Sequence, residues 1–147
     1  MKMSIEIYVE AAMVRKQRGR LVGAIAYTAL DANGCIDDED WEPVDYVVDQ
    51  AYLDLSALAF GLKHARDSDV IYSSSDYCVK GFNEWLGGWK RRDWRNANKE
   101  TIANADLWRL VEEISKNKNV EVRKVAACSA GKDAAYRYAL AVANRQL

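Results

Sequence analysis

The chain has few of the residues that usually hold metals or form cross-links. It contains one proline, three cysteines and one histidine, His64, whose sequence neighbours suggest no partner. The cysteines are odd in number and follow no metal-ligand spacing, so we expect free thiols in a reducing, cytoplasmic (intracellular) compartment. No apolar run approaches the ~20 residues of a membrane span, and the N-terminus lacks the apolar stretch of a secretory signal. We therefore expect no membrane partner.

The length and the charge of the chain indicate its domain organisation and which partners it can bind. At 147 residues, half of them apolar, it is expected to fold as one domain, residues 1–147, with a proper hydrophobic core. Its net charge of −1 hides an asymmetry, because residues 31–62 carry nine acids and no Lys or Arg, whereas residues 80–99 carry six cations and two acids. A near-neutral total therefore does not exclude nucleic acid as a partner, since the local field steers binding.

Alternation of apolar and polar residues indicates strands in the first third of the chain. The elements expected there are a strand at Ser4–Val9, a turn region at residues 11–20, a strand at Leu21–Leu30, a hairpin turn at residues 31–34, and a third strand near Cys35 or at Val44–Val48 beside an acidic loop at residues 37–42. Three strands joined in this way favour an antiparallel arrangement.

The rest of the chain alternates helices with short strands. We expect helices at Asp49–Arg66, Ser75–Leu86, Thr101–Ser115 and Lys132–Arg145, and strands at Asp69–Ser74 and Val120–Val125. Gly87 and Gly88 are expected to end the second of these helices. Antiparallel strands followed by strands that alternate with helices imply an α/β fold with helices on both faces of the sheet.

The most informative stretch, residues 71–108, combines aromatic rings with positive charge. It holds four of the five tryptophans and the densest basic run, Lys90–Arg92. Cations that meet phosphates and rings that meet sugars or bases suit a nucleic-acid strand. The same composition also suits the solvated face of an amphipathic helix, so composition alone leaves both interpretations open.

The order of residues in this stretch resembles ribonuclease HI. Residues 71–82 read IYSSSDYCVKGF, where the family has I-Y-T-D-S-Q-Y-V-x-x-G-I. Residues 85–94 read WLGGWKRRDW and residues 104–108 read NADLW, where the family has W-x-x-x-W-K-[KR]-x-x-W and N-x-D-L-W. The resemblance implies a ribonuclease H-like fold: a five-stranded mixed sheet, with three antiparallel strands and then two parallel ones, helices on both faces and a basic protrusion.

The resemblance also implies a chemistry. Enzymes of this family cut the RNA strand of an RNA–DNA hybrid with two Mg²⁺ or Mn²⁺ ions, which need several carboxylates. The matching positions, on the first strand, the first helix, the end of the fourth strand and the last helix, are Glu10, Asp54, Ser74 and Ala139. Glu10 and Asp54 keep a carboxylate and are the candidate metal ligands, whereas Ser74 and Ala139 are vestigial. Asp76, two residues after Ser74, is a catalytic candidate if the strand end is shifted.

The residues that bind nucleic acid in this family are better preserved in this chain than the carboxylates. Residues that match Tyr77, Trp85 and Trp89 line a channel for the DNA strand, and the position of Asn104 contributes to a phosphate pocket. The protrusion that grips the backbone of the hybrid matches Lys90, Arg91, Arg92, Trp94 and Arg95. Trp108 is expected to pack beneath the protrusion as part of the core.

Three hypotheses follow. The kept binding residues and the incomplete carboxylate set favour a pseudo-nuclease that binds an RNA–DNA hybrid or a related duplex. The first alternative is an active, Mg²⁺- or Mn²⁺-dependent endoribonuclease with a rearranged centre of Glu10, Asp54 and Asp76. The second is a protein-interaction domain that reuses the fold to bind a protein partner or a second copy of itself, since Trp, Tyr and Arg also dominate interface hot spots.

Overall fold

A five-stranded sheet forms the centre of the computed structural model, which describes residues 4–45, 49–126 and 129–145. The strands are β1 (Glu6–Arg15), β2 (Leu21–Leu30), β3 (Ile36–Val44), β4 (Val70–Ser73) and β5 (Glu121–Lys124). Their order across the sheet is β3-β2-β1-β4-β5. β1 and β3 pair antiparallel with β2, whereas β4 pairs parallel with β1 and β5. The predicted mixed sheet is therefore confirmed.

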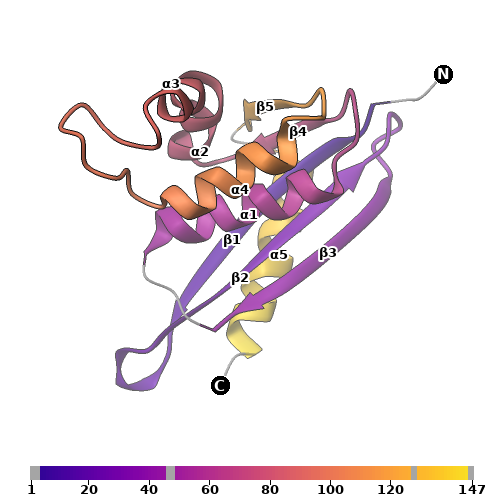
Figure 1. The fold of residues 1–147 in the computed structure, drawn as a ribbon. Coiled ribbons are helices and arrows are strands. Elements are labelled where there is room, and N and C mark those ends of the chain that lie inside the picture. Colours follow the sequence, from indigo (N-terminus) through magenta and orange to yellow (C-terminus); the bar gives the residue numbers. More distant parts are fainter. Residues whose placement is uncertain (1–3, 46–48, 127–128, 146–147) are drawn as a thin grey trace.

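Helices cover both faces of this sheet. They are α1 (Gln50–His64), α2 (Asp76–Lys80), α3 (Leu86–Arg91), α4 (Ala105–Ser115) and α5 (Ala130–Arg145). Figure 1 shows α1 and α4 in front of the sheet and α5 behind it. α1 packs on β1 and β2 and contacts α4, whereas α5 packs on β1, β2 and β3. This arrangement confirms the predicted layers.

The core beneath α1 is built from large aliphatic side chains. Leu58 and Leu62, which lie four residues apart on one face of α1, are fully buried together with Ile7 of β1. Gly61 allows the helix to approach the sheet, because a Cβ atom there would lie 2.3 Å from Cγ1 of Val9. Asp49 begins the helix by accepting a hydrogen bond from the backbone N–H of Tyr52 at 2.8 Å.

Small residues line the opposite layer. Ala24 and Ala26 of β2 are fully buried against Ala139 and Ala143 of α5, and Ala12 of β1 joins the same cluster. Because none of these side chains extends beyond Cβ, α5 can lie close to the sheet. The vestigial position Ala139 thus faces the sheet at the centre of an alanine layer.

Two sequence expectations about the strands are wrong. β1 continues through residues 11–15, paired with β2 as far as Arg15 and Leu21, so the predicted turn region shrinks to residues 16–20. The predicted acidic loop at residues 37–42 lies within β3, which includes Pro43. Charged residues and a proline suit β3 because it is an edge strand, with one side free of pairing. Of the alternative strand at Val44–Val48, residues 46–48 lie outside the described residues.

The helical segment after β4 also differs from expectation. Ser75 caps α2, and the helix continues through a π-helical turn (Gly81–Trp85) directly into α3, so Gly87 and Gly88 do not end it. A segment of turns, residues 92–104, which folds back on itself through a bridge between Arg95 and Thr101, then leads to α4, which begins at Ala105 rather than at Thr101. We call residues 86–104 the protrusion, because this part of the chain projects from the body of the molecule in Figure 1.

Candidate functional site

A polar cavity opens where β4 ends. β4 pairs with β1 only from Glu6 to Val9, so β1 runs on past the last residue of β4, Ser73. The cavity at this place has a volume of about 360 Å³ and lies between β1, α1 and α5. Its lining residues are Glu10, Ala11, Met13, Gln50, Asp54, Ser74, Lys132 and Tyr136. The fold therefore brings together three of the four positions that the sequence singled out: Glu10, Asp54 and Ser74.

Glu10 is the most buried acid of the cavity, with an exposed fraction of 7%. The hydroxyl of Ser74 donates a hydrogen bond to its Oε2 at 2.9 Å, whereas its buried Oε1 has no hydrogen-bond partner in the described part of the chain. Burial raises the pKa of Glu10 to about 7, although the Ser74 hydrogen bond and the charge of Lys132 act in the opposite direction. Glu10 is thus an acid whose second oxygen is available to a cation.

Asp54 enters the cavity from α1. The side-chain amide of Gln50, one helical turn earlier, donates a hydrogen bond to Oδ1 of Asp54 at 2.8 Å. Burial raises the pKa of Asp54, and the negative charge of Asp54 in turn raises the pKa of Glu10. Two acids that disfavour each other's ionisation in one cavity create a place where positive charge is stabilising.

Asp76 does not line this cavity. Its exposed carboxylate forms an ion pair with Lys124 of β5, at 3.1 Å between Oδ1 and Nζ. The same Nζ donates a hydrogen bond to the backbone carbonyl of Ser74 at 2.6 Å. Asp76 therefore belongs to a surface contact that joins α2 to β5, and the strand end is not shifted toward it.

On α5, the cavity is reached by residues other than the one expected. Ala139 is fully buried in the alanine layer, whereas Lys132 and Tyr136, one helical turn apart, line the cavity. The part of α5 that lines the cavity thus presents an ammonium group and a phenol, whereas the family has a carboxylate on this helix. The sequence did not single out Lys132, Tyr136 or Gln50 as residues of the site.

The cavity fits one divalent cation better than two. The unpartnered Oε1 of Glu10, the carboxylate of Asp54 and the hydroxyl of Ser74 are oxygen ligands of the kind that Mg²⁺ prefers. No three His, Cys, Asp or Glu side chains of the described residues are grouped so that they could hold a metal ion. Lys132 adds a positive charge that competes with any bound cation.

The raised pKa of Glu10 predicts a pH-dependent stability. Because the folded-state pKa of about 7 exceeds the ordinary 4.5, the folded chain binds more protons than the unfolded chain between those values, and stability falls as the pH rises through that window. Glu10→Gln keeps an acceptor for Ser74 but cannot ionise. At ~1.4 kcal/mol per pKa unit, the wild type is expected to lose about 2 kcal/mol of stability relative to this variant between pH 5 and 7.5.

Urea unfolding at both pH values measures this difference in stability, and Asp76→Asn, which changes an exposed carboxylate, is the control. Parallel pH profiles of the wild type and Glu10→Gln would contradict the assignment.

A chain of aromatic rings leads from the core to the surface of the helical segment that follows β4. Trp108 is fully buried, as expected, and its indole N–H donates to the hydroxyl of Tyr77 at 2.8 Å. Trp89 packs on Trp108 at 5.2 Å between ring centroids, and Trp85 follows at 5.7 Å from Trp89. Trp85 is 40% exposed, so its ring ends this aromatic chain at the surface.

Asn104, expected at a phosphate pocket, lies next to Tyr77, expected in the channel for the DNA strand. The amide of Asn104 donates to the hydroxyl of Tyr77 at 3.3 Å, and Asn104 holds a left-handed backbone conformation with φ of 57° at the start of α4. These two side chains come from α2 and from the residue before α4, and they meet on the face that carries Trp85 and Trp89.

The cations of the protrusion divide into two groups. Lys90 forms an ion pair with Glu112 of α4 at 2.7 Å, and Arg95 donates to the backbone carbonyl of Lys99 at 3.0 Å. Both have structural partners. Arg91 and Arg92 are exposed, and neither forms an ion pair within the described ranges. These two guanidinium groups are therefore the ones free to bind phosphate.

Trp94, expected to contact nucleic acid, is mostly buried. Its exposed fraction is 8%, and the guanidinium of Arg109 lies over its ring at 5.8 Å from the centroid. The protrusion turns inward here because Asp93 and Trp94 both adopt positive φ. Trp94 thus anchors the protrusion to α4 and presents little of its ring to a ligand.

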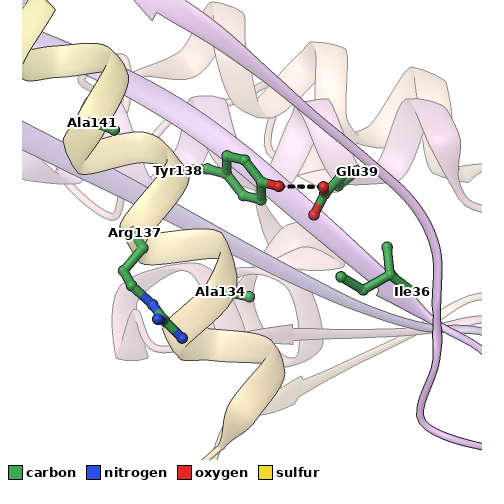
Figure 2. Close-up of a pocket in the computed structure, with 6 residues that line it drawn as sticks. All are labelled: Ile36, Glu39, Ala134, Arg137, Tyr138 and Ala141. Carbon is green, nitrogen blue, oxygen red and sulfur yellow. Dashed lines mark hydrogen bonds between the residues drawn. The ribbon is translucent and has the colours of Figure 1, made fainter.

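A second cavity of about 360 Å³ lies between α5 and β3 (Figure 2). Its lining residues are Ile36, Glu39, Ala134, Arg137, Tyr138 and Ala141. Tyr138 donates a hydrogen bond to Glu39, as Figure 2 shows, and its ring stacks on Trp41. This lining is mainly apolar and brings no second acid beside Glu39. The cavity that contains Glu10 is the better candidate for chemistry on a charged substrate.

Comparison with known proteins agrees with this geometry. The model of the RNase H family matches residues 2–143. Ribonuclease H of Pseudomonas fluorescens is 41% identical over 70 residues, which cover 46% of this chain and 47% of that protein. Ribonuclease H of Dechloromonas aromatica is 48% identical over 42 residues, 29% of this chain and 28% of that protein. The matches thus span about half or less of these relatives.

Solved structures share the fold at low sequence identity. The solution structure of the PFV RNase H domain has a TM-score of 0.87 at 14% identity and covers 98% of this chain and 96% of that one. LC9-RNase H1, described as a type 1 RNase H with the type 2 active-site motif, has a TM-score of 0.79 at 22% identity, with 100% and 75% covered. A foamy viral protease-reverse transcriptase, solved with an RNA/DNA hybrid, has a TM-score of 0.80 at 16% identity, with 96% and 20% covered.

No helix in the described part of the chain is long and apolar enough to cross a membrane.

Proposed function

This chain belongs to the RNase H family, and from that premise we propose that it binds an RNA–DNA hybrid or a related duplex and cleaves it slowly or not at all. The observation that carries the proposal is the content of the polar cavity. Two acids, Glu10 and Asp54, share it with Ser74 and with a cation, Lys132. The aromatic and basic surface, by comparison, keeps an exposed ring, Trp85, and two exposed guanidinium groups, Arg91 and Arg92.

The carboxylate set is too small for the two-metal reaction. Two divalent ions, when bound, activate the attacking water and stabilise the leaving oxygen, and their combined charge needs several carboxylates around it. In this cavity a neutral hydroxyl, that of Ser74, occupies the third position. The ammonium of Lys132 supplies fixed positive charge that neutralises part of the charge of Glu10 and leaves less for a second ion. Binding of one Mg²⁺ or Mn²⁺ by Glu10 and Asp54 remains compatible with this lining.

The exposed aromatic and basic residues of the helical segment and the protrusion support binding of a nucleic-acid backbone. Trp85 offers an exposed ring for a sugar or base, and Arg91 and Arg92 offer unpaired guanidinium groups for phosphates. The amide of Asn104, which donates a hydrogen bond to the hydroxyl of Tyr77, adds a polar group to the same region. A hybrid or a related duplex is the proposed ligand because foamy viral protease-reverse transcriptases of the same fold were solved with an RNA/DNA hybrid and with dsDNA.

Binding and cleavage of a labelled hybrid, measured together, test this proposal. We expect binding whose affinity falls steeply with salt, and little cleavage with Mg²⁺ or Mn²⁺. The variant Arg91→Ala/Arg92→Ala is expected to weaken binding about tenfold at low salt and to reduce the slope of log K against log salt by about 1.8, because each phosphate contact contributes about 0.9.

A matched control removes two cations from the far ends of the helices in front of the sheet. Lys63→Ala/Lys116→Ala changes the net charge equally but takes both cations from the C-terminal turn of α1 and the end of α4. It is expected to bind as the wild type does. Absence of binding by the wild type would refute the proposed ligand. Rapid cleavage that Glu10→Gln abolishes would instead show an active centre built on the two remaining acids.

A further inference from the structure

The turn between β1 and β2 carries a second concentration of positive charge. The two strands pair over their whole length, from Glu6 with Leu30 to Arg15 with Leu21. The connecting hairpin tip, residues 15–20, reads RKQRGR and contains four cations and no acid. In Figure 1 this hairpin extends beyond the helices at the lower left of the molecule. The proposed function makes no use of it.

The hairpin tip has a fixed conformation. The backbone N–H of Lys16 donates to the carbonyl of Arg20 at 2.7 Å, and the guanidinium of Arg15 donates to the carbonyl of Gly19 at 3.1 Å. The ammonium of Lys16 donates to the carbonyl of Asn144 at 2.7 Å, near the end of α5, where helix carbonyls lack partners within the helix. Arg15 therefore stabilises the turn itself, and Lys16 ties the turn to the end of α5.

The other two cations are presented to solvent. Arg18 and Arg20 are exposed, and neither has an acidic partner within the described ranges. Arg18 also adopts a left-handed backbone conformation with φ of 65°, which is unfavourable by about 1 kcal/mol for a residue with a side chain. A strained, charged residue at a rigid tip is costly for stability alone, and such outliers occur preferentially where a ligand is bound.

The tip stands at a distance from the cavity that suits a duplex. Glu10 and Arg15 lie on the same strand, so at ~3.3 Å per residue they are separated by about 16 Å, and the turn lies beyond. Phosphates along one strand of a duplex repeat every ~3.4 Å, which places the tip about five nucleotides or more from the cavity. In Figure 1 the tip and the protrusion project toward the same side, with the beginning of α1 between them.

We propose that Arg18 and Arg20 of the hairpin tip form a second phosphate-binding element, so that a duplex is held at the protrusion and at the tip with the polar cavity between these two contacts. This inference rests on the proposed function. It adds a binding site for the sugar–phosphate backbone on β1 and β2, and it assigns Arg15 and Lys16 the positioning of that site.

Salt-dependent binding of a hybrid of about 18 base pairs tests the inference. Arg18→Ala/Arg20→Ala is expected to weaken binding about tenfold at low salt and to lower the salt slope by about 1.8, as two lost phosphate contacts would. Arg18→Lys/Arg20→Lys, which keeps both charges, is expected to restore most of the affinity and the slope. Thermal unfolding of each variant, followed by circular dichroism, checks that the hairpin still folds.

The outcomes separate this inference from the function on which it rests. If Arg18→Ala/Arg20→Ala binds with the affinity and slope of the wild type while Arg91→Ala/Arg92→Ala is weakened, the tip is not a contact and the proposed function stands. If the lysine variant fails to restore binding, the loss comes from the fold of the hairpin and the inference is wrong. If the wild type does not bind the hybrid, both proposals fall.

Discussion

Ser74→Asp is expected to increase the affinity of the cavity for Mn²⁺ by about tenfold or more. The new carboxylate would stand beside Glu10, whose Oε2 lies 2.9 Å from the hydroxyl of Ser74. Three acids in one cavity repel one another when no cation is bound, and cation affinity rises with the number of charged ligands. The same substitution is expected to lower stability in the absence of metal, because like charges are brought together.

Calorimetric titration with Mn²⁺, together with the metal-dependent rise in unfolding temperature, measures this effect. A ligand that binds only the folded state stabilises it in proportion to RT ln(1 + [L]/Kd), so both readouts report the same affinity. Ser75→Asp is the matched control, since it adds the same charge one residue away, at the cap of α2, where aspartate is tolerated. Equal Mn²⁺ affinity in the two variants would show that Ser74 does not face a cation site.

Gly81→Ala is expected to destabilise the protein by about 3 kcal/mol, at the upper end of the usual cost of overfilling a core. A Cβ atom at this position would lie 2.3 Å from Cη2 and 2.4 Å from Cζ2 of Trp108. That ring is fully buried, donates a hydrogen bond to Tyr77 and packs on Trp89, so it has no room to move. Since Gly81 has an ordinary helical backbone conformation, the clash alone is responsible.

Gly87→Ala provides the comparison within the same helical segment. There the nearest atom to a new Cβ is the end of the Arg91 side chain at 3.4 Å, which is flexible. Because alanine favours a helix over glycine, this variant is expected to gain about 0.5 to 1 kcal/mol. Urea unfolding of both variants gives the two free energies. A loss of less than 1 kcal/mol in Gly81→Ala would mean that the aromatic chain can shift, and with it the surface position of Trp85.

The sequence predicted the sheet and its helices well because apolar periodicity is a local property. It misjudged β1, since residues 11–14 are apolar without alternation and such a run suits a strand buried on both faces. It misjudged β3, since acids at residues 37–42 resemble a loop unless the strand is known to lie at the edge of a sheet. Both errors concern position in the fold, which a local pattern does not contain.

The candidate site was predicted in part. Glu10, Asp54 and Ser74 were located through the resemblance of the sequence to the family, and the structure brings them together in one cavity. Lys132 and Tyr136 carried no such signal in the sequence, because they reach the cavity only through the packing of α5 on β1 and β2.

His64 shows a further limit. The sequence suggested no partner, yet its Nδ1 lies 3.2 Å from the hydroxyl of Tyr27 and 3.3 Å from Oδ2 of Asp38. These three residues come from α1, β2 and β3, so no spacing along the chain could reveal that they meet. The contact joins the end of α1 to the edge of the sheet.

The acidic edge strand has a consequence for how a polyanion would arrive. β3 carries acids at residues 37–40 and 42, whereas Arg91 and Arg92 lie on the protrusion and Arg18 and Arg20 at the hairpin tip. Opposite charges on different elements give the molecule a directional electrostatic field, which repels a nucleic acid from the edge of the sheet and attracts it to the arginines. Productive orientation can thus begin before contact, within a Debye length of about 8 Å at physiological ionic strength. Salt would then slow association as well as weaken the complex.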